Sequence, residues 1–226
     1  ISCSLVGSEM CIRDRCRHYG KKQVLAGATG QFPAGSFVGI LGLNGSGKTT
    51  LLNILGNFDR RFTGVITLRG KKVAYMRTRM PYPEWWKVSD VLGFCGRFYD
   101  FDAERAERML QNTDVRRNAR LFSLSEGMKR QLNFIAAYCV RSEVLLLDEP
   151  LTNLDVNYRG VIVDALIERA MEERVIAVAT HEIKEFENLF THVTVLQGGR
   201  LSELAGAEEI RARGMGIEEY YRGCLR

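Results

Sequence analysis

Residues 42–49 read Gly-Leu-Asn-Gly-Ser-Gly-Lys-Thr, and this stretch constrains the fold more than any other. Glycines at 42, 45 and 47 let the backbone wrap closely enough for its N–H groups to surround phosphate oxygens. The spacing is that of a P-loop, in which the lysine reaches the terminal phosphates and the hydroxyl residue faces Mg²⁺. Such a loop requires a buried strand before it and a helix after it. The chain is therefore expected to contain an α/β core.

The segments on both sides of this loop fit that requirement. Residues 37–41 form a short apolar run, typical of a strand buried on both faces of a parallel sheet. Residues 49–55 continue as a helix whose N-terminal N–H groups would converge on the phosphates. Further buried strands are predicted at 144–147 and 175–179, and a terminal hairpin at 193–201.

Two other stretches complete the coarse architecture. Residues 64–75 predict a hairpin that turns near Arg69 and Gly70. Between residues 78 and 140 the pattern is helical, and its clearest sign is an apolar stripe at positions i, i+3, i+4, i+7 and i+8. The stripe consists of Leu132, Ile135, Ala136, Cys139 and Val140. The sequence thus predicts an α/β core interrupted by a helical subdomain.

Composition narrows the classes of protein. No apolar run approaches the roughly 18 residues that span a bilayer, so work at a membrane would need a partner. The net charge of +5 is dispersed, which favours a solvated basic face over a nucleic-acid surface. The cysteines beyond residue 15 lack paired C-x-x-C spacing, which favours reduced thiols over disulfides or a metal site. They are Cys16, Cys95, Cys139 and Cys224.

Three further motifs follow the glycine-rich loop in order. Residues 124–128 read Leu-Ser-Glu-Gly-Met, the apolar run at 144–147 ends in Asp148 and Glu149, and Thr180-His181 follows the next strand. This series resembles the signature, Walker B and switch motifs of ATP-binding cassette (ABC) ATPases. The resemblance implies a P-loop NTPase (RecA-like) core with a mainly parallel sheet, an antiparallel β subdomain and an inserted helical subdomain.

The resemblance also implies how the chain is divided. One ABC ATPase domain would cover residues 16–226, with its catalytic core in 16–77 and 141–226 and the helical subdomain in 78–140. Residues 4–15, SLVGSEMCIRDR, instead resemble a translated sequencing adapter, so residues 1–15 are predicted to be a non-native tail. On this interpretation the strand that usually opens a cassette is missing. The alternative is a genuine irregular tail.

For the motif residues, the resemblance implies catalytic roles. Lys48 would contact the β- and γ-phosphates, while Thr49 and Asp148 would hold Mg²⁺. Glu149 would be the general base, and His181 would contact the γ-phosphate and orient the attacking water. In isolation, a strand-end acidic pair is often only solvated and a lone histidine is usually structural, but the neighbouring motifs favour catalysis. The implied ATP-binding residues are Tyr19, Gly42, Leu43, Asn44, Gly45, Ser46, Gly47, Lys48, Thr49 and Thr50, with Ser125 and Gly127 acting from the opposite subunit of a dimer.

Some positions depart from the family pattern or leave two interpretations open. Glu126 and Met128 replace the glycine and glutamine of the commonest signature, LSGGQ. Thr78 stands where the family usually has a glutamine that touches Mg²⁺, so any metal contact there is expected to be weak. Tyr19 would stack on adenine or be an ordinary packing residue.

A cluster of aromatic residues follows Thr78. Its members are Tyr82, Trp85 and Trp86. Such a cluster suits a groove that receives a helix of a membrane subunit, and equally the packed interior of the helical subdomain. The sequence leaves both interpretations open.

These features together predict the ATP-binding and ATP-hydrolysing subunit of an ABC transporter. It would dimerise around two ATP molecules with Mg²⁺, as a homodimer or heterodimer, and drive partner membrane permeases from the cytoplasmic face of the membrane. Residues 75–92 most resemble the branch that exports antibiotics, peptides or lipids. The alternative is a soluble ABC ATPase acting on the ribosome or nucleic acid. It is disfavoured because one cassette is present, with only about 75 residues between the P-loop and the signature.

Overall fold

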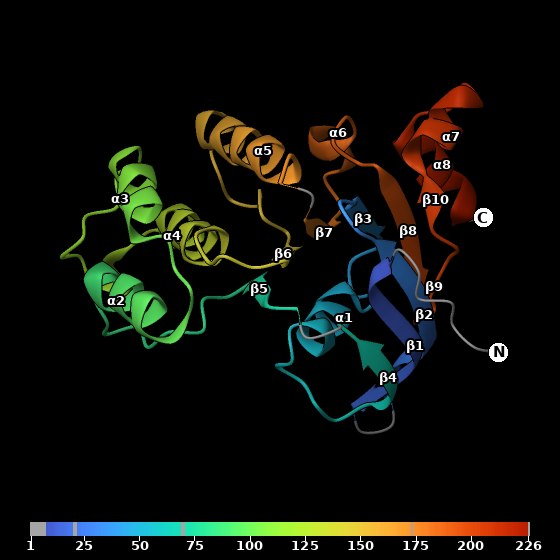
Figure 1. Ribbon diagram of the computed structural model, residues 1–226, viewed down its shortest axis with the longest axis horizontal. Coiled ribbons are helices and arrows are strands. Elements are labelled where there is room, and N and C mark those ends of the chain that lie inside the picture. Colours follow the sequence, from blue (N-terminus) through green and yellow to red (C-terminus); the bar gives the residue numbers. More distant parts are fainter. Residues whose placement is uncertain (1–7, 20–21, 69–70, 173, 226) are drawn as a thin grey trace.

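A mainly parallel β-sheet forms the centre of the molecule. The computed structural model describes residues 8–19, 22–68, 71–172 and 174–225 (Figure 1). Within these ranges the strand order is β10-β8-β3-β7-β6-β5, where β10 and the short β9 pair antiparallel with β8 and the other neighbours are parallel. The strands are β3 (Phe37–Leu41), β5 (Val73–Met76), β6 (Val144–Asp148), β7 (Val175–Thr180), β8 (His192–Gln197), β9 (Arg200–Leu201) and β10 (Ala205–Gly206).

The middle strands of this sheet are buried along their whole length. Every residue of β3, β6 and β7 is buried, because both faces of the sheet are covered. Successive side chains of a strand point to opposite faces. In β6, Leu145 and Leu147 therefore join one hydrophobic core, whereas Val144 and Leu146 join the other. The buried strands predicted from the apolar runs are confirmed.

Helices cover the two faces of the sheet. One core contains α1 (Lys48–Leu55), and the other contains residues of α4 (Glu126–Tyr138) and α5 (Val156–Ala170). Figure 1 shows α1 on one side of the central strands and α5 with α6 (Ile183–Phe186) on the other. Two C-terminal helices, α7 (Ala207–Ala212) and α8 (Ile217–Cys224), complete this second layer. Among the described residues, no helix has the length and apolar character that crossing a bilayer requires.

A second, antiparallel sheet has the order β2-β1-β4. Its strands are β1 (Ser8–Tyr19), β2 (Lys22–Pro33) and β4 (Thr63–Thr67). Met10 and Ile12 of β1 are fully buried in the core that contains α1. The prediction of a missing opening strand is therefore wrong, because residues 8–15 supply inward apolar side chains and pair with both neighbours. Residues 1–7 lie outside the described residues, and the origin of the segment stays a prediction.

The two hairpins predicted from the sequence have different outcomes. The terminal hairpin is confirmed, because β8 and β9 pair across Gly198 and Gly199, which have φ values of 56° and 76°. The hairpin predicted over residues 64–75 is wrong. β4 pairs with β1 in the small sheet, whereas β5 pairs in parallel with β6 in the large sheet. The alternating pattern reveals both strands but not their partners.

The helical insert lies between β5 and β6. It comprises α2 (Val88–Phe98), α3 (Ala103–Gln111), a 3₁₀ turn at Leu121–Ser123 and α4. Figure 1 shows α2, α3 and α4 grouped at the opposite end of the molecule from α7 and α8. All five residues of the predicted apolar stripe are buried, although the last two lie just beyond the end of α4. The predicted fold class is confirmed, and the numerical domain boundaries stay a prediction.

Candidate active site

The glycine-rich loop connects β3 to α1 at the carboxyl end of the parallel strands. A Cβ on Gly42 would lie 2.7 Å from the carbonyl oxygen of Leu196 and 2.7 Å from Ser46 Oγ, so a larger residue does not fit. Gly45 and Gly47 have φ values of +79° and +108°, a backbone region that favours glycine. Gly47 is also the N-cap of α1. The loop conformation therefore depends on the glycines that predicted it.

Lys48 is buried at the start of α1, with its ammonium group folded back onto the loop. Its Nζ donates to the carbonyl oxygens of Gly42 at 2.8 Å and Leu43 at 3.3 Å. It also lies 3.7 Å from Glu149 Oε1. A buried positive charge is thus held where the loop would surround an anion.

The other predicted loop residues line the same turn. Leu43, Asn44, Gly45 and Thr49 are exposed, and Ser46 and Thr50 are half-buried. The hydroxyl oxygen of Ser46 is buried and has no hydrogen-bond partner among the described residues. An unsatisfied buried hydroxyl is costly. This hydroxyl is a polar group that a bound phosphate oxygen would satisfy.

Asp148 ends β6 and is completely buried. Burial raises the pKa of this carboxyl group above its ordinary value, while hydrogen bonds from the hydroxyls of Thr78 and Thr49 act in the opposite direction. Thr78 donates to Oδ2, whereas Oδ1 has no hydrogen-bond partner among the described residues. A buried carboxylate oxygen without a partner is a suitable ligand for a hard cation.

The residues around Asp148 therefore fit the Mg²⁺ ion that the ABC family uses with ATP. The unpartnered Asp148 oxygen and the Thr49 hydroxyl would hold it. When bound, the ion would neutralise negative charge on the phosphate oxygens. The expectation that Thr78 contacts the metal only weakly stays a prediction, but its hydroxyl does reach the expected ligand, Asp148.

Glu149 and His181 come together at the ends of β6 and β7. Oε2 of Glu149 lies 2.9 Å from Nδ1 of His181 and accepts a hydrogen bond from its backbone N–H at 3.3 Å. Glu149 has φ 49°, and its own N–H donates to the carbonyl oxygen of Ala179 on β7. This turn directs the carboxylate between His181 and Lys48. The structure thus brings together the three residues predicted to be catalytic.

The predicted signature residues lie at the N-terminus of α4. Ser125 is the N-cap, and its Oγ accepts a hydrogen bond from the N–H of Met128 at 3.2 Å. A Cβ on Gly127 would lie 3.1 Å from the carbonyl oxygen of Asn153. Among the described residues, no hydrogen bond or ion pair joins Ser125 or Gly127 to the P-loop. Their predicted action on a second subunit's nucleotide stays a prediction.

Tyr19 is the last residue of β1. Its side chain lies outside the part of the chain that the structure describes. The predicted stacking on adenine therefore stays a prediction.

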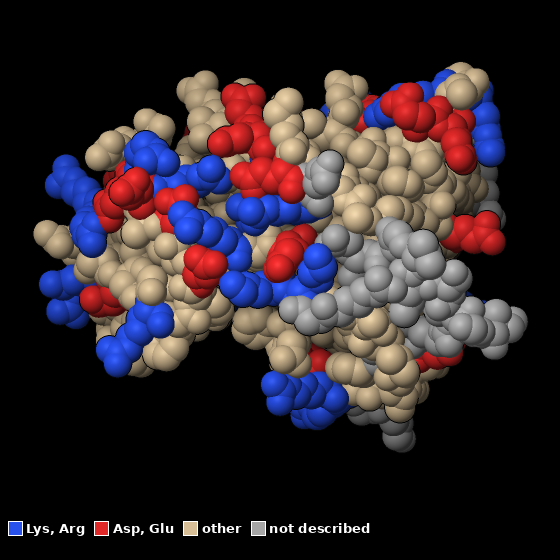
Figure 2. Space-filling model, viewed as in Figure 1, with Lys and Arg blue, Asp and Glu red and all other residues tan. Residues whose placement is uncertain are grey.

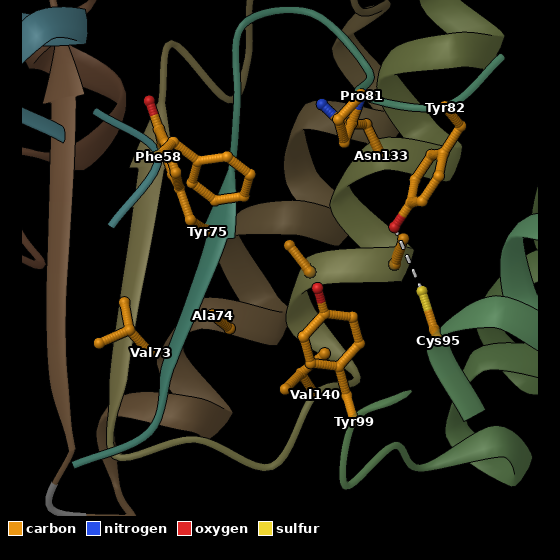
Figure 3. Close-up of a pocket in the computed structure, with 12 residues that line it drawn as sticks. Phe58, Val73, Ala74, Tyr75, Pro81, Tyr82, Cys95, Tyr99, Asn133 and Val140 are labelled. Carbon is orange, nitrogen blue, oxygen red and sulfur yellow. Dashed lines mark hydrogen bonds between the residues drawn. The ribbon is translucent and has the colours of Figure 1, made fainter. Parts of the chain in front are cut away.

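The aromatic cluster after Thr78 divides into two parts. Tyr82 and Trp86 stack with ring centroids 5.8 Å apart and pack against the core that contains α4 and α5, whereas Trp85 is 68% exposed. Beside them is a cavity of about 70 Å³ between β5, α2 and α4 (Figure 3). In it, the Tyr82 hydroxyl points toward Cys95 Sγ, 3.4 Å away. Packing within the helical subdomain thus applies to Tyr82 and Trp86, whereas contact of the cluster with a membrane subunit stays a prediction.

Sequence reasoning missed Arg130, which lies one turn into α4. The side chain is buried, and its Nη1 has no hydrogen-bond partner among the described residues. Burial lowers its pKa, although the negative charges of Asp148 and Glu149 act in the opposite direction. It lines a cavity of about 370 Å³ together with Thr78. Glu126, one turn earlier in α4, also acts on this charge, but Asp148 and Glu149 lie at the end of β6, and no local pattern signals their proximity to Arg130.

This arrangement defines a class of protein. The site combines a P-loop between β3 and α1 with Asp148 and Glu149 at the end of β6 and His181 at the end of β7. These are the parts of a P-loop nucleoside triphosphatase. The model of the family described as "ABC transporter" matches residues 25–152, more than half of the chain, and the chain belongs to that family. Its members' ATP-binding subunits are ATPases, so the predicted enzyme class is confirmed.

Relatives agree with this assignment, and a solved structure agrees with the fold. The chain is 32% identical over 198 residues to an aliphatic sulfonates import ATP-binding protein of Nocardia farcinica, covering 85% of this chain and 78% of that protein. It is 30% identical over 202 residues to a Nod factor export ATP-binding protein of Rhizobium meliloti, covering 81% and 60%. The solved ATP-binding subunit of an ABC transporter superposes with a TM-score of 0.85 at 21% identity, covering 97% of this chain and all of that one. The relatives thus include both import and export proteins.

Proposed function

We propose that this ATPase subunit hydrolyses ATP by using Glu149 as the general base. The observation that carries the proposal is the position of the Glu149 carboxylate, 2.9 Å from His181 on one side and 3.7 Å from Lys48 on the other. A carboxylate held at a phosphate-binding loop is placed to accept a proton from an attacking water. Nδ1 of the His181 imidazole faces Glu149, so Nε2 is the ring nitrogen left to face the γ-phosphate.

The remaining residues bind and neutralise the triphosphate. The P-loop N–H groups and the N-terminus of α1 would surround the phosphates, with Lys48 contributing the nearest positive charge. Phosphoryl transfer to water depends mainly on such positioning and charge stabilisation. Asp148 has an oxygen without a hydrogen-bond partner among the described residues, and this oxygen would bind the cation that accompanies ATP.

Two subunits would share each nucleotide. Ser125 caps α4, and the first N–H groups of a helix together with its dipole attract anions. In a head-to-tail dimer this N-terminus would meet the γ-phosphate bound by the opposite subunit. The dimer is formed by two copies of this chain or by one copy and a related subunit.

The membrane partner would contact the exposed side of the aromatic cluster. The helical subdomain exposes Trp85 and three further aromatic side chains, those of Phe98, Tyr99 and Phe122. Exposed aromatic side chains favour a protein contact. We place the subunit at the cytoplasmic face of the membrane, with permease subunits that export their substrate, as the resemblance over residues 75–92 and the Nod factor relative favour.

The distribution of charge supports a protein partner over a nucleic acid. On the face shown in Figure 2, Lys and Arg side chains are interspersed with Asp and Glu rather than collected into one basic patch. Nucleic-acid binding relies on many unpaired cations along the phosphate backbone. Several Lys and Arg side chains of the described residues are paired instead, for example Arg105 with Glu168.

The test of the proposed function is Glu149→Gln, which keeps the shape of the side chain and removes its basicity. Hydrolysis should fall by about 10²–10⁴-fold, while MgATP binding persists and a nucleotide-bound dimer accumulates in size-exclusion chromatography. Lys48→Ala should instead lose both binding and hydrolysis. Normal turnover by Glu149→Gln would refute the assignment of the general base.

A further inference from the structure

Arg159 lies in the first turn of α5 and joins two loops that meet near the proposed catalytic pair. Its Nε donates to the carbonyl oxygen of Leu154 at 3.1 Å. Its Nη2 lies 3.0 Å from Glu182 Oε1, and its Nη1 lies 3.5 Å from Glu185 Oε1. Because the guanidinium is planar, the directions of these N–H groups are fixed relative to one another. The three contacts therefore hold the Leu154 loop and the start of α6 in one relative position.

The start of α6 is directly connected to the catalytic pair. Glu182 follows His181 in the chain, and its backbone N–H donates to Thr180 Oγ1 at 2.9 Å. His181 contacts Oε2 of Glu149 with both its ring and its backbone N–H. One peptide unit thus separates the side chain that Arg159 holds from the residue that meets Glu149. A displacement of Glu182 would move His181.

Burial gives the contact its strength. The side chains of Arg159 and Glu182 are 25% and 22% exposed, so the pair is shielded more than a typical surface ion pair. Glu182 Oε2 is buried and has no hydrogen-bond partner among the described residues. Without Arg159, a largely buried carboxylate would be left unpaired, and it would have to move toward water to regain solvation.

We propose that Arg159 is a positioning residue for ATP hydrolysis. It holds the turn that carries His181 in place against Glu149. The proposal rests on the roles proposed above for Glu149 and His181. Because Arg159 also contacts Leu154, the position of the loop before α5 is linked to that of the catalytic pair.

The first experiment compares Arg159→Met and Arg159→Lys with a matched control. Arg159→Met should lower kcat for ATP hydrolysis by about 10–100-fold, the size of effect expected when a catalytic group is misplaced, with ATP affinity unchanged. Arg159→Lys keeps the charge but not the planar fork, and should recover part of the loss. The control is Arg105→Met, because Arg105 is 24% exposed and pairs with Glu168 and Glu172 away from the site. Its kcat should stay at the wild-type value.

The second experiment is a double-mutant cycle with His181→Ala. If Arg159 acts through His181, Arg159→Met should cause no further loss of kcat in the His181→Ala background. Losses that multiply would overturn the inference, because a purely structural role acts independently of His181. If His181→Ala alone kept full activity, the proposed role of His181 would fail first, and this inference with it. Thermal unfolding of each variant confirms that the compared proteins are folded.

Discussion

The hydroxyl of Thr78 donates a hydrogen bond to Oδ2 of Asp148. Thr78 follows β5 and Asp148 ends β6, so the bond crosses between two neighbouring parallel strands. It leaves Oδ1 as the oxygen without a partner among the described residues. Thr78 thus orients the carboxylate that would hold the cation, and does so at the position where the family usually has a longer amide side chain.

Replacing Thr78 by valine removes the hydroxyl and keeps the shape of the side chain. A hydrogen bond to a charged group contributes about 1.5–3 kcal/mol, so we expect ATP hydrolysis to fall by roughly 10–100-fold at limiting Mg²⁺. The Mg²⁺ concentration for half-maximal rate should rise, and Thr78→Ser should restore it. Rates measured across a Mg²⁺ titration test this. Unchanged ATPase and Mg²⁺ dependence in Thr78→Val would exclude a role for the hydroxyl.

The buried carboxylate of Asp148 should lower the stability of the protein when no cation is bound. A buried, partly unsatisfied charged group costs on the order of 1–3 kcal/mol, and an amide of the same shape avoids part of that cost. Asp148→Asn should therefore raise Tm in EDTA by about 2–4 °C for each kcal/mol gained, while ATPase activity is lost. Calorimetry with and without EDTA measures both states. A Tm below that of the wild type would contradict the prediction.

His192 gives the stability of the fold a predictable dependence on pH. Burial lowers the pKa of His192, although the negative charge of Glu209 acts in the opposite direction. Because the folded pKa lies below the unfolded one, the unfolded chain takes up a proton first as the pH falls. The stability that depends on His192 is thus present above the unfolded pKa and is lost as the pH falls through the folded pKa.

The test is the variant His192→Gln, with unfolding followed by denaturant titration from pH 8 to pH 5. The variant should lose less stability than the wild type over the acidic part of this range. His18→Gln is the control, since His18 is exposed. Parallel stability profiles for wild type and His192→Gln would show that another group causes the acid sensitivity.

The two tryptophans should respond differently to truncation. Trp86 stacks on Tyr82 and contacts Phe94 at 5.6 Å between ring centroids, so Trp86→Ala should lower the free energy of unfolding by at least about 1 kcal/mol. Trp85 is largely exposed, and Trp85→Ala should leave stability unchanged. It should instead weaken co-purification with the membrane subunits when these are co-expressed. Equal destabilisation by both changes would argue that the whole cluster serves only packing.

The motifs were predictable from the sequence because each is local. The glycine spacing at 42–47 and the apolar run ending at Asp148 fix a strand, a turn and the residues at its end within a few positions. The glycine-rich loop and Asp148 lie close together because parallel strands present their carboxyl ends at one edge of a sheet. The fold class and the group formed by Lys48, Glu149 and His181 could be predicted in this way.

The missed features depend on contacts between distant segments. Thr78 and Asp148 are 70 residues apart, and nothing near either residue indicates that they bond. Residues 64–75 contain two strands, yet pairing with β1 and β6 separates them into different sheets. Arg159 likewise contacts Glu182 only because the start of α5 lies beside the residues that follow β7. Local patterns specify elements, whereas long-range packing decides their partners.

The first half of β1 provides the last prediction, because its residues were expected to lie outside the fold. Ile12 is completely buried against the core of the small sheet and α1, so Ile12→Ala should lower the free energy of unfolding by about 2–4 kcal/mol. Val65→Ala in β4 is the matched control, since Val65 pairs with the same strand but is 61% exposed, and it should have little effect. Denaturant unfolding measures both. If Ile12→Ala were as stable as the wild type, residues 8–15 would not contribute to the folded core in solution.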